Sequence, residues 1–175
     1  ESIPGIEGKI ASIGGPSIFK DSIAVWISAV WKNACGSEYL IYRKGNNPWQ
    51  KALSQGESIP GIEGKIASVG GPSISEDYIA VCINSGGPGH LICRKGNNPW
   101  QKVLSEGESI PGIEREITDI GNPSLFKNSI AVKISVYGQE HLIYRKGNNP
   151  WQKVLSEGES IPGIEGKIAS IGGPS

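Results

Sequence analysis

One stretch of sequence occurs three times and constrains the fold more than any other feature. It runs from Arg43 to Glu63 and returns at Arg94–Glu114 and Arg145–Glu165, always as RKGNNPWQK-x-LS-x-GESIPGIE. The turn-forming GNNP precedes a Trp-led run, and a Gly/Pro corner follows it, which predicts a tight hairpin, a strand and a sharp change of direction. A unit present in three copies indicates a repeat protein rather than a protein with one active site.

The motif ESIPGIE sets the boundaries of the repeats. It begins at Glu1, Glu57, Glu108 and Glu159, so the repeats occupy residues 1–56, 57–107 and 108–158, and residues 159–175 begin a fourth. Residues 159–175 are identical to residues 1–17. The first repeat is longer because Ser28–Tyr39 replaces the shorter Ser135–His141, which predicts an insertion in a loop. A chain that opens inside a repeat, without Met, leads us to expect that it was excised from something longer.

Each repeat predicts four short strands. Ile/Val-rich runs alternate with polar residues, and 25 Gly and 12 Pro divide the runs too often for helices. The strands expected in the first repeat are Lys9–Ile13, Ser22–Ser28, Tyr39–Lys44 and Trp49–Leu53. We expect the first strand to end in a turn at Gly14–Ser17, and Gly70–Gly71 to form the matching turn. In the third repeat, Gly138–Gln139 is expected to turn a hairpin.

The repeat pattern predicts an all-β protein, a β-propeller of four-stranded antiparallel blades of about 51 residues each. The alternative is a β-trefoil, which also uses three repeats of four strands. The fourth copy of the first strand favours the propeller, because a three-fold trefoil has no place for it. The chain therefore corresponds to blade 1 (1–56), blade 2 (57–107), blade 3 (108–158) and a partial blade (159–175).

Three blades and a strand are fewer than the four to eight of ordinary propellers. The two end blades would leave apolar faces open to water, so we expect association of the chain with itself. A homodimer that closes the ring is the simplest solution. The duplicate first strand, at Glu1–Ser17 and Glu159–Ser175, is expected to act as a strand-swapping latch between subunits.

The sequence also resembles known propeller repeats. The segments GESIPGIEGKIASVGGPSI (Gly56–Ile74), IAVWIS (Ile23–Ser28) and LIYRKG (Leu40–Gly45) are similar to the blade pattern of bacterial tandem-repeat propellers. The resemblance covers all three repeats, although Glu stands where that family usually has Asp after Gly. A fainter similarity to tectonin-type propeller repeats, whose members include lectins, lies in PG, VW, IYR and PW.

Charge and motif content point away from several functions. Lys plus Arg equal Asp plus Glu, 17 each, so we predict neither nucleic-acid binding nor attraction to an anionic membrane. No apolar run is long enough to span a membrane. No catalytic or metal-ligating pattern is present, and we predict neither an enzyme nor a cofactor. The two histidines, His90 and His141, are expected at a hairpin edge. The sequence does not predict a compartment.

A repeated aromatic cluster is the candidate binding site. Each copy places a tryptophan after two asparagines and downstream of an arginine, and these groups can hold the apolar face and hydroxyls of a sugar. The residues are Arg43, Asn46 and Trp49; Arg94, Asn97 and Trp100; and Arg145, Asn148 and Trp151. The competing interpretation, which we favour, is that the turn is structural and each tryptophan packs between neighbouring blades.

The sequence accordingly favours a non-catalytic repeat module that assembles into a closed propeller. The alternative is a multivalent lectin, with glycans as partners and one weak site per blade.

Two of the three cysteines could face each other. Cys82 and Cys93 are equidistant from Gly87–Pro88, so a hairpin centred there would pair them, as it would pair Trp26 with Tyr42. A disulfide is one interpretation. The other, which we favour, is that two small apolar residues fill the space that Trp and Tyr fill in the first repeat.

Overall fold

The computed structural model describes residues 3–30 and 36–174, and this part of the chain consists of β-strands and their connections. None of the described residues forms a helix, so nothing in this part of the structure has the length and apolarity of a membrane-crossing helix. The prediction of an all-β protein is confirmed.

The strands form three sheets of four strands each. Sheet 1 contains β1 (Lys9–Phe19), β2 (Ser22–Val30), β3 (Ser37–Lys44) and β4 (Gln50–Ser54). Sheet 2 contains β5 (Ser68–Ser75), β6 (Tyr78–Asn84), β7 (Gly89–Lys95) and β8 (Gln101–Ser105). Sheet 3 contains β9 (Asp119–Phe126), β10 (Ser129–Val136), β11 (Gln139–Lys146) and β12 (Gln152–Ser156).

Each sheet is built from consecutive strands of one repeat. The strands are antiparallel and lie side by side in chain order, so every connection within a sheet is a hairpin. This order confirms the prediction of four antiparallel strands per repeat. Residues 55–67 and 106–118 then carry the chain from the last strand of one sheet to the first strand of the next.

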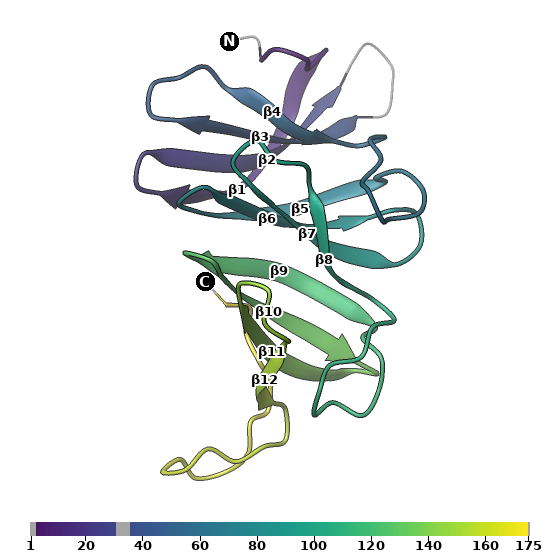
Figure 1. Cartoon of the computed structure of the whole chain (residues 1–175), viewed down its shortest axis with the longest axis vertical. Coiled ribbons are helices and arrows are strands. Elements are labelled where there is room, and N and C mark those ends of the chain that lie inside the picture. The colour runs from purple at the N-terminus through teal and green to yellow at the C-terminus, as the bar shows by residue number, and fades with distance from the viewer. Residues whose placement is uncertain (1–2, 31–35, 175) are drawn as a thin grey trace.

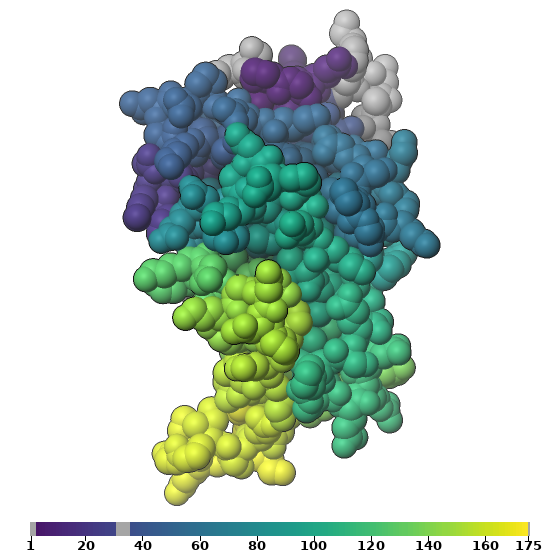
Figure 2. Space-filling model, in the orientation of Figure 1, coloured from purple at the N-terminus to yellow at the C-terminus, as the bar shows by residue number. Residues whose placement is uncertain are grey.

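The three sheets stack face to face along the long axis of the molecule (Figure 1). The space-filling view shows them as successive layers, with the residues after β12 projecting at the far end (Figure 2). Neighbouring sheets meet mainly through the first strand of the later sheet: β5 contacts β1, β2 and β3, and β9 contacts β5, β6 and β7. The fourth strands reach the junctions through side chains, such as Ala52 and Leu53 of β4.

Alternation along the strands gives each sheet two apolar faces. One face, which we call the Ile/Val face, points toward the preceding sheet; in sheet 2 it carries Ile66, Val69, Ile79, Val81, Ile83, Ile92 and Trp100. The opposite face, which we call the Leu face, points toward the following sheet; in sheet 1 it carries Ala24, Leu40, Ala52 and Leu53. The two faces together form the buried core of each junction.

The GGPS segments are not turns, contrary to the prediction. Gly14–Ser17 lies inside β1, where Pro16 pairs with Val25 and the register shifts between Ile13 and Pro16. A bulge of this kind, on the first strand of a sheet, accommodates a residue that has no backbone donor. Small residues are also needed there, because a Cβ at Gly14 would come within 2.8 Å of the Trp26 ring.

The turn of the first hairpin lies at Lys20–Asp21, beyond the expected Gly14–Ser17. Lys20 takes φ 52° between the paired ends Phe19 and Ser22, and Glu76 and Lys127 hold the same place in the other sheets. The turn of the third-repeat hairpin, in contrast, was predicted one residue too late, at Gly138–Gln139. Its two-residue turn is Tyr137–Gly138, both with positive φ, and Gln139 already pairs with Val136.

The partial fourth repeat was predicted to repeat the first strand, and among its described residues, 159–174, it does not. It follows the course of residues 57–69 across the preceding sheet and then runs extended without a strand partner. The reason is physical: β5 and β9 become strands by pairing with β6 and β10, and no second strand follows residue 174 in this structure.

The insertion of the first repeat lies in the connection between β2 and β3, as expected of a loop. Residues 31–35 of that connection, including Cys35, lie outside the described part of the chain.

Candidate functional site

The Arg/Asn/Trp clusters are positioned by the GNNP turns between the third and fourth strands. Gly96 adopts φ 55° in this turn, and its backbone N–H donates to the carbonyl oxygen of Asp77 at 2.6 Å. The turns of sheets 1 and 3 repeat this bond, from Gly45 to Asp21 and from Gly147 to Asn128. Each turn is therefore fixed to the β-hairpin beside it, and the tryptophan that follows enters the junction between two sheets.

Two of the three tryptophans are junction residues. The side chains of Trp100 and Trp151 are each 8% exposed. The indole N–H of Trp100 donates to the carbonyl oxygen of Ala52 in the preceding sheet at 3.1 Å, and that of Trp151 donates to Val103 at 3.4 Å. Trp49 has no preceding sheet in this structure and is half-buried on the Ile/Val face of sheet 1. This geometry agrees with packing between sheets.

Each arginine stacks on the tryptophan of its own repeat. The guanidinium carbons of Arg43, Arg94 and Arg145 lie 4.8, 4.9 and 5.2 Å from the ring centroids of Trp49, Trp100 and Trp151. Arg94 also lies 5.0 Å from the ring of Tyr42 in the preceding sheet. A cation over an indole is a stabilising contact, and it occupies the ring face that a sugar would need. The tryptophans are thus poorly placed as open stacking plates.

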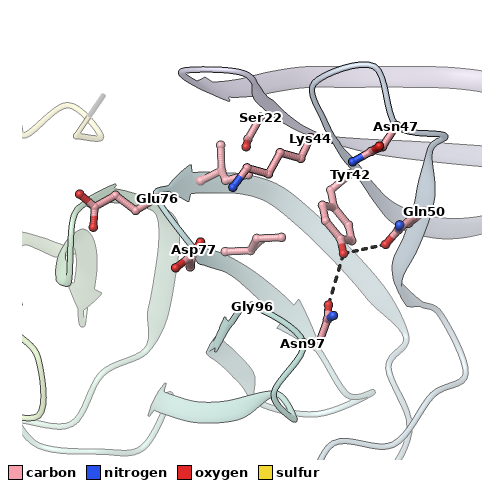
Figure 3. Close-up of a pocket in the computed structure, with 11 residues that line it drawn as sticks. Ser22, Tyr42, Lys44, Asn47, Gln50, Glu76, Asp77, Gly96 and Asn97 are labelled. Atoms are coloured by element: carbon pink, nitrogen blue, oxygen red, sulfur yellow. Dashed lines mark hydrogen bonds between the residues drawn. The ribbon is translucent and has the colours of Figure 1, made fainter.

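Two equivalent pockets lie between neighbouring sheets. The first has a volume of about 260 Å³ and lies between sheets 1 and 2 (Figure 3). There the hydroxyl of Tyr42 lies 2.7 Å from Gln50 Oε1 and 3.5 Å from Asn97 Oδ1. The second, of about 240 Å³, lies between sheets 2 and 3. Both are lined by the same repeat positions, the first through Lys44, Asn47, Gln50, Gly96 and Asn97, the second through Lys95, Asn98, Gln101, Gly147 and Asn148.

The structure therefore splits the predicted cluster. Asn97 and Asn148 line pockets together with groups of the preceding sheet, whereas Asn46 lies at the open end of sheet 1. Sequence reasoning missed the glutamine after each tryptophan, although it belongs to the repeated motif. The sequence alone could not show that two consecutive repeats line one pocket together.

The predicted pairing of Cys82 with Cys93 is wrong. Cys82 pairs with Leu91 and Cys93 with Ala80, because the connection is the four-residue loop Ser85–Pro88, centred one residue earlier than assumed. Trp26 likewise pairs with Leu40 rather than Tyr42. Both thiols are free and pack at the junction with sheet 3, where the Sγ of Cys82 lies 3.0 Å from the carbonyl oxygen of Gly121.

The histidines are buried rather than at a hairpin edge. His90 and His141 are 7% and 5% exposed, and their Nδ1 atoms each lie 2.8 Å from a serine hydroxyl, of Ser105 and Ser156 respectively. Burial lowers the pKa of both imidazoles, and nearby lysines lower it further. A neutral histidine bonded to a buried serine here joins the third and fourth strands of its sheet, which is a structural contact.

Among residues 3–30 and 36–174, no three His, Cys, Asp or Glu side chains gather closely enough to hold a metal ion. Comparison with known proteins found no matching family model, no similar curated protein and no similar solved structure. Function must therefore be inferred from the geometry of the junctions and of the two ends of the stack.

The thiols of Cys82 and Cys93 are expected to be unreactive in the folded protein. Burial, together with the carboxylates of Asp119 and Glu106, raises the pKa of Cys82 to about 12, and burial raises the pKa of Cys93 to about 11. In a Cys35→Ser variant, DTNB at about pH 8 should label neither thiol until guanidinium unfolds the chain, and then both. Rapid labelling of the native protein, or missing thiols after unfolding without reductant, would contradict this assignment.

Trp100→Phe is expected to lower the free energy of unfolding by about 1–3 kcal/mol, because it leaves the buried carbonyl oxygen of Ala52 without its donor. Urea unfolding measures the change. The matched control is Trp26→Phe, since the buried indole nitrogen of Trp26 has no partner among the described residues and its removal costs no hydrogen bond. Equal losses in the two variants would show that the indole bond contributes nothing.

Proposed function

We propose that this chain is a non-catalytic module, a three-bladed arc of a β-propeller, and that two copies join head to tail into a closed ring of six blades. The observation that carries the proposal is a contrast along the Ile/Val faces. Side chains that the internal junctions bury are exposed on β1, at the end of the stack.

The exposed fractions of equivalent side chains differ strongly between the end of the stack and the internal junctions. Ile10, Ile13 and Ile18 on β1 are 44%, 68% and 64% exposed. Their equivalents in sheet 2, Ile66, Val69 and Ile74, are 2%, 5% and 6% exposed. In sheet 3, Ile117 and Leu125 are 2% and 9% exposed, and Ile120 is half-buried. Ile10 and Ile13, together with Val25, Ile27 and Trp49, line an apolar hollow of about 370 Å³.

The far end of the stack offers the complementary surface. Ala52 and Leu53 of sheet 1 are 8% and 0% exposed beneath sheet 2. The same positions in sheet 3 are Val154, which is 48% exposed, and Leu155, which is half-buried. The Leu face of sheet 3 is thus uncovered, and so is the Ile/Val face of sheet 1. At the internal junctions, faces of these two kinds cover each other.

Polar groups at the two ends match in the same way. The hydroxyl oxygen of Ser17 accepts a hydrogen bond from the backbone N–H of Ile74 at 3.0 Å, and that of Ser73 accepts one from Leu125 at 2.9 Å. At a closing junction, the equivalent hydrogen bond would run from the backbone N–H of Ile18 in one copy to the hydroxyl oxygen of Ser124 in the other. The indole of Trp49 would donate to the carbonyl of Val154 in the same way.

The propeller assignment draws support from the topology. Each sheet is formed by one repeat, and the first strand of each later sheet packs against the sheet before it, as in blades around an axis. A head-to-tail contact of this kind forms a ring when its rotation closes.

The free energy gained by burying these apolar side chains is sufficient for association. Fully burying one isoleucine contributes about 1.5–3 kcal/mol. The ring would bury β1 side chains at both closing junctions, together with two Leu faces, whereas association costs about 4–15 kcal/mol in lost freedom.

Ile18→Lys is expected to convert a two-chain particle into single folded chains, because the Ile18 side chain is 64% exposed in one chain but would be buried in the ring, as Ile74 is at the internal junction. Sedimentation velocity measures the mass, and circular dichroism the fold. Tyr137→Ser is the control: it removes a side chain that is 70% exposed, in a hairpin turn rather than on a sheet face. A wild-type chain that sediments as a monomer, or an Ile18→Lys variant that still associates, would contradict the proposal.

A second candidate function is multivalent glycan binding at the inter-sheet pockets. It is favoured by the recurrence of the same lysine, asparagine and glutamine positions at both junctions. Amide groups beside charges of both signs, such as Lys44 and Asp77, suit a neutral ligand rich in hydroxyl groups. The varied positions, Tyr42 in one pocket and Cys93 in the other, would tune affinity between junctions.

The glycan candidate predicts binding of the wild-type chain on a glycan array, reduced at least tenfold by the double substitution Gln50→Ala and Gln101→Ala with the fold unchanged. The control is Lys65→Ala, an exposed residue that lines neither pocket. An array without bound glycan, or binding that survives the double substitution, would rule out these pockets as the site.

A further inference from the structure

The segment that joins one sheet to the next occupies a defined slot on the preceding sheet. Between sheets 1 and 2, the N–H of Gly56 donates to the carbonyl of Ile66 at 2.8 Å and so closes the bend of the connecting segment. The N–H of Val69 then donates to Glu38 Oε2 of sheet 1 at 2.7 Å. From Ser68 onward the chain pairs with β6 and becomes the first strand of sheet 2.

The C-terminal copy already holds the corresponding slot on sheet 3. The N–H of Gly158 donates to the carbonyl of Ile168 at 2.8 Å, and the N–H of Ile171 donates to Glu140 Oε2 at 2.7 Å. The side chain of Ile171 is 8% exposed. This copy therefore makes the same two hydrogen bonds as the segment at an internal junction, but it has no neighbouring strand to pair with.

The N-terminal copy pairs with a neighbouring strand but has no preceding sheet to pack against. Residues 9–19 pair with β2, but Ile10 and Ile13 remain 44% and 68% exposed, and the ladder shifts register twice. When a second chain supplies the missing sheet, residues 3–13 of one copy and residues 161–171 of the other require the same slot. Since the two sequences are identical, either copy fits and only one can remain.

The asymmetry between the copies decides which one leaves. Displacing the C-terminal copy exposes Ile171 and breaks its bond to Glu140. Displacing the N-terminal copy uncovers Ile3, which is 9% exposed, but no comparably buried isoleucine of β1, and the ladder to β2 that it gives up is rebuilt by the identical residues of the other chain.

We propose that the two chains exchange strands at the closing junctions: residues 167–174 of one chain pair with β2 of the other and replace residues 9–16 there. This inference rests on the proposed head-to-tail dimer and adds a backbone ladder to its apolar contacts. The register follows from the internal sheets. Ser12 pairs with Ser28, Ser68 with Asn84 and Asp119 with Ser135, so Ser170 of one chain would pair with Ser28 of the other.

Disulfide trapping tests the exchange. The hydroxyl oxygens of Ser12 and Ser28 lie 2.6 Å apart, so cysteines at paired positions come within bonding reach. In a background without the native cysteines, mild oxidation of a Ser28→Cys, Ser170→Cys variant should give mostly covalent dimers on a non-reducing gel. The matched Ser12→Cys, Ser28→Cys variant, which links β1 to β2 within one chain, should give little cross-linked product. Mixing chains that carry only Ser28→Cys with tagged chains that carry only Ser170→Cys should give a linked heterodimer.

The outcomes separate the two proposals. A native mass of two chains, with efficient linkage of positions 12 and 28 within each chain and none between 28 and 170, would overturn the exchange and leave the dimer standing. A native mass of one chain would overturn both.

Discussion

The structure depends on one repeated contact, the docking of an Ile/Val face on the Leu face of the sheet before it. A four-stranded sheet with two apolar faces cannot remain alone in water, so each sheet requires a neighbour on both sides. The same junction contains the indole bond from Trp100 to Ala52, the serine bond from Ser17 to Ile74 and the carboxylate bond from Glu38 to Val69. These bonds give the junction a fixed direction, and that direction makes a head-to-tail ring the natural assembly.

The conspicuous side chains of the repeat serve this contact first. The tryptophans of sheets 2 and 3 are covered by an arginine on one side and by the preceding sheet on the other, and the histidines are bonded within their own sheets. What remains open to a ligand lies beside them, in the pockets that two consecutive repeats form together. A ring of this kind would multiply such pockets, which is why assembly and glycan binding are compatible functions.

Local sequence predicted most of the strands, because alternation and turn residues act within a few positions. Errors arose where a distant contact decided the outcome. Gly14 and Pro16 have the chemistry of a turn, but the neighbouring β2 and the ring of Trp26 make their segment a bulged strand. The pairing of Cys82 with Cys93 failed because a loop of four residues shifts the register, and loop length cannot be read from Gly and Pro alone. Residues 159–174 repeat the sequence of a strand but lack the strand that would pair with it.

The central claim is that the exposed faces of sheets 1 and 3 are two halves of one junction. Small-angle X-ray scattering of the 175-residue chain tests it most directly, because mass and shape come from one profile. The account predicts the mass of two chains and a compact ring. Scattering from a single chain with the elongated stack of Figure 1 would contradict it.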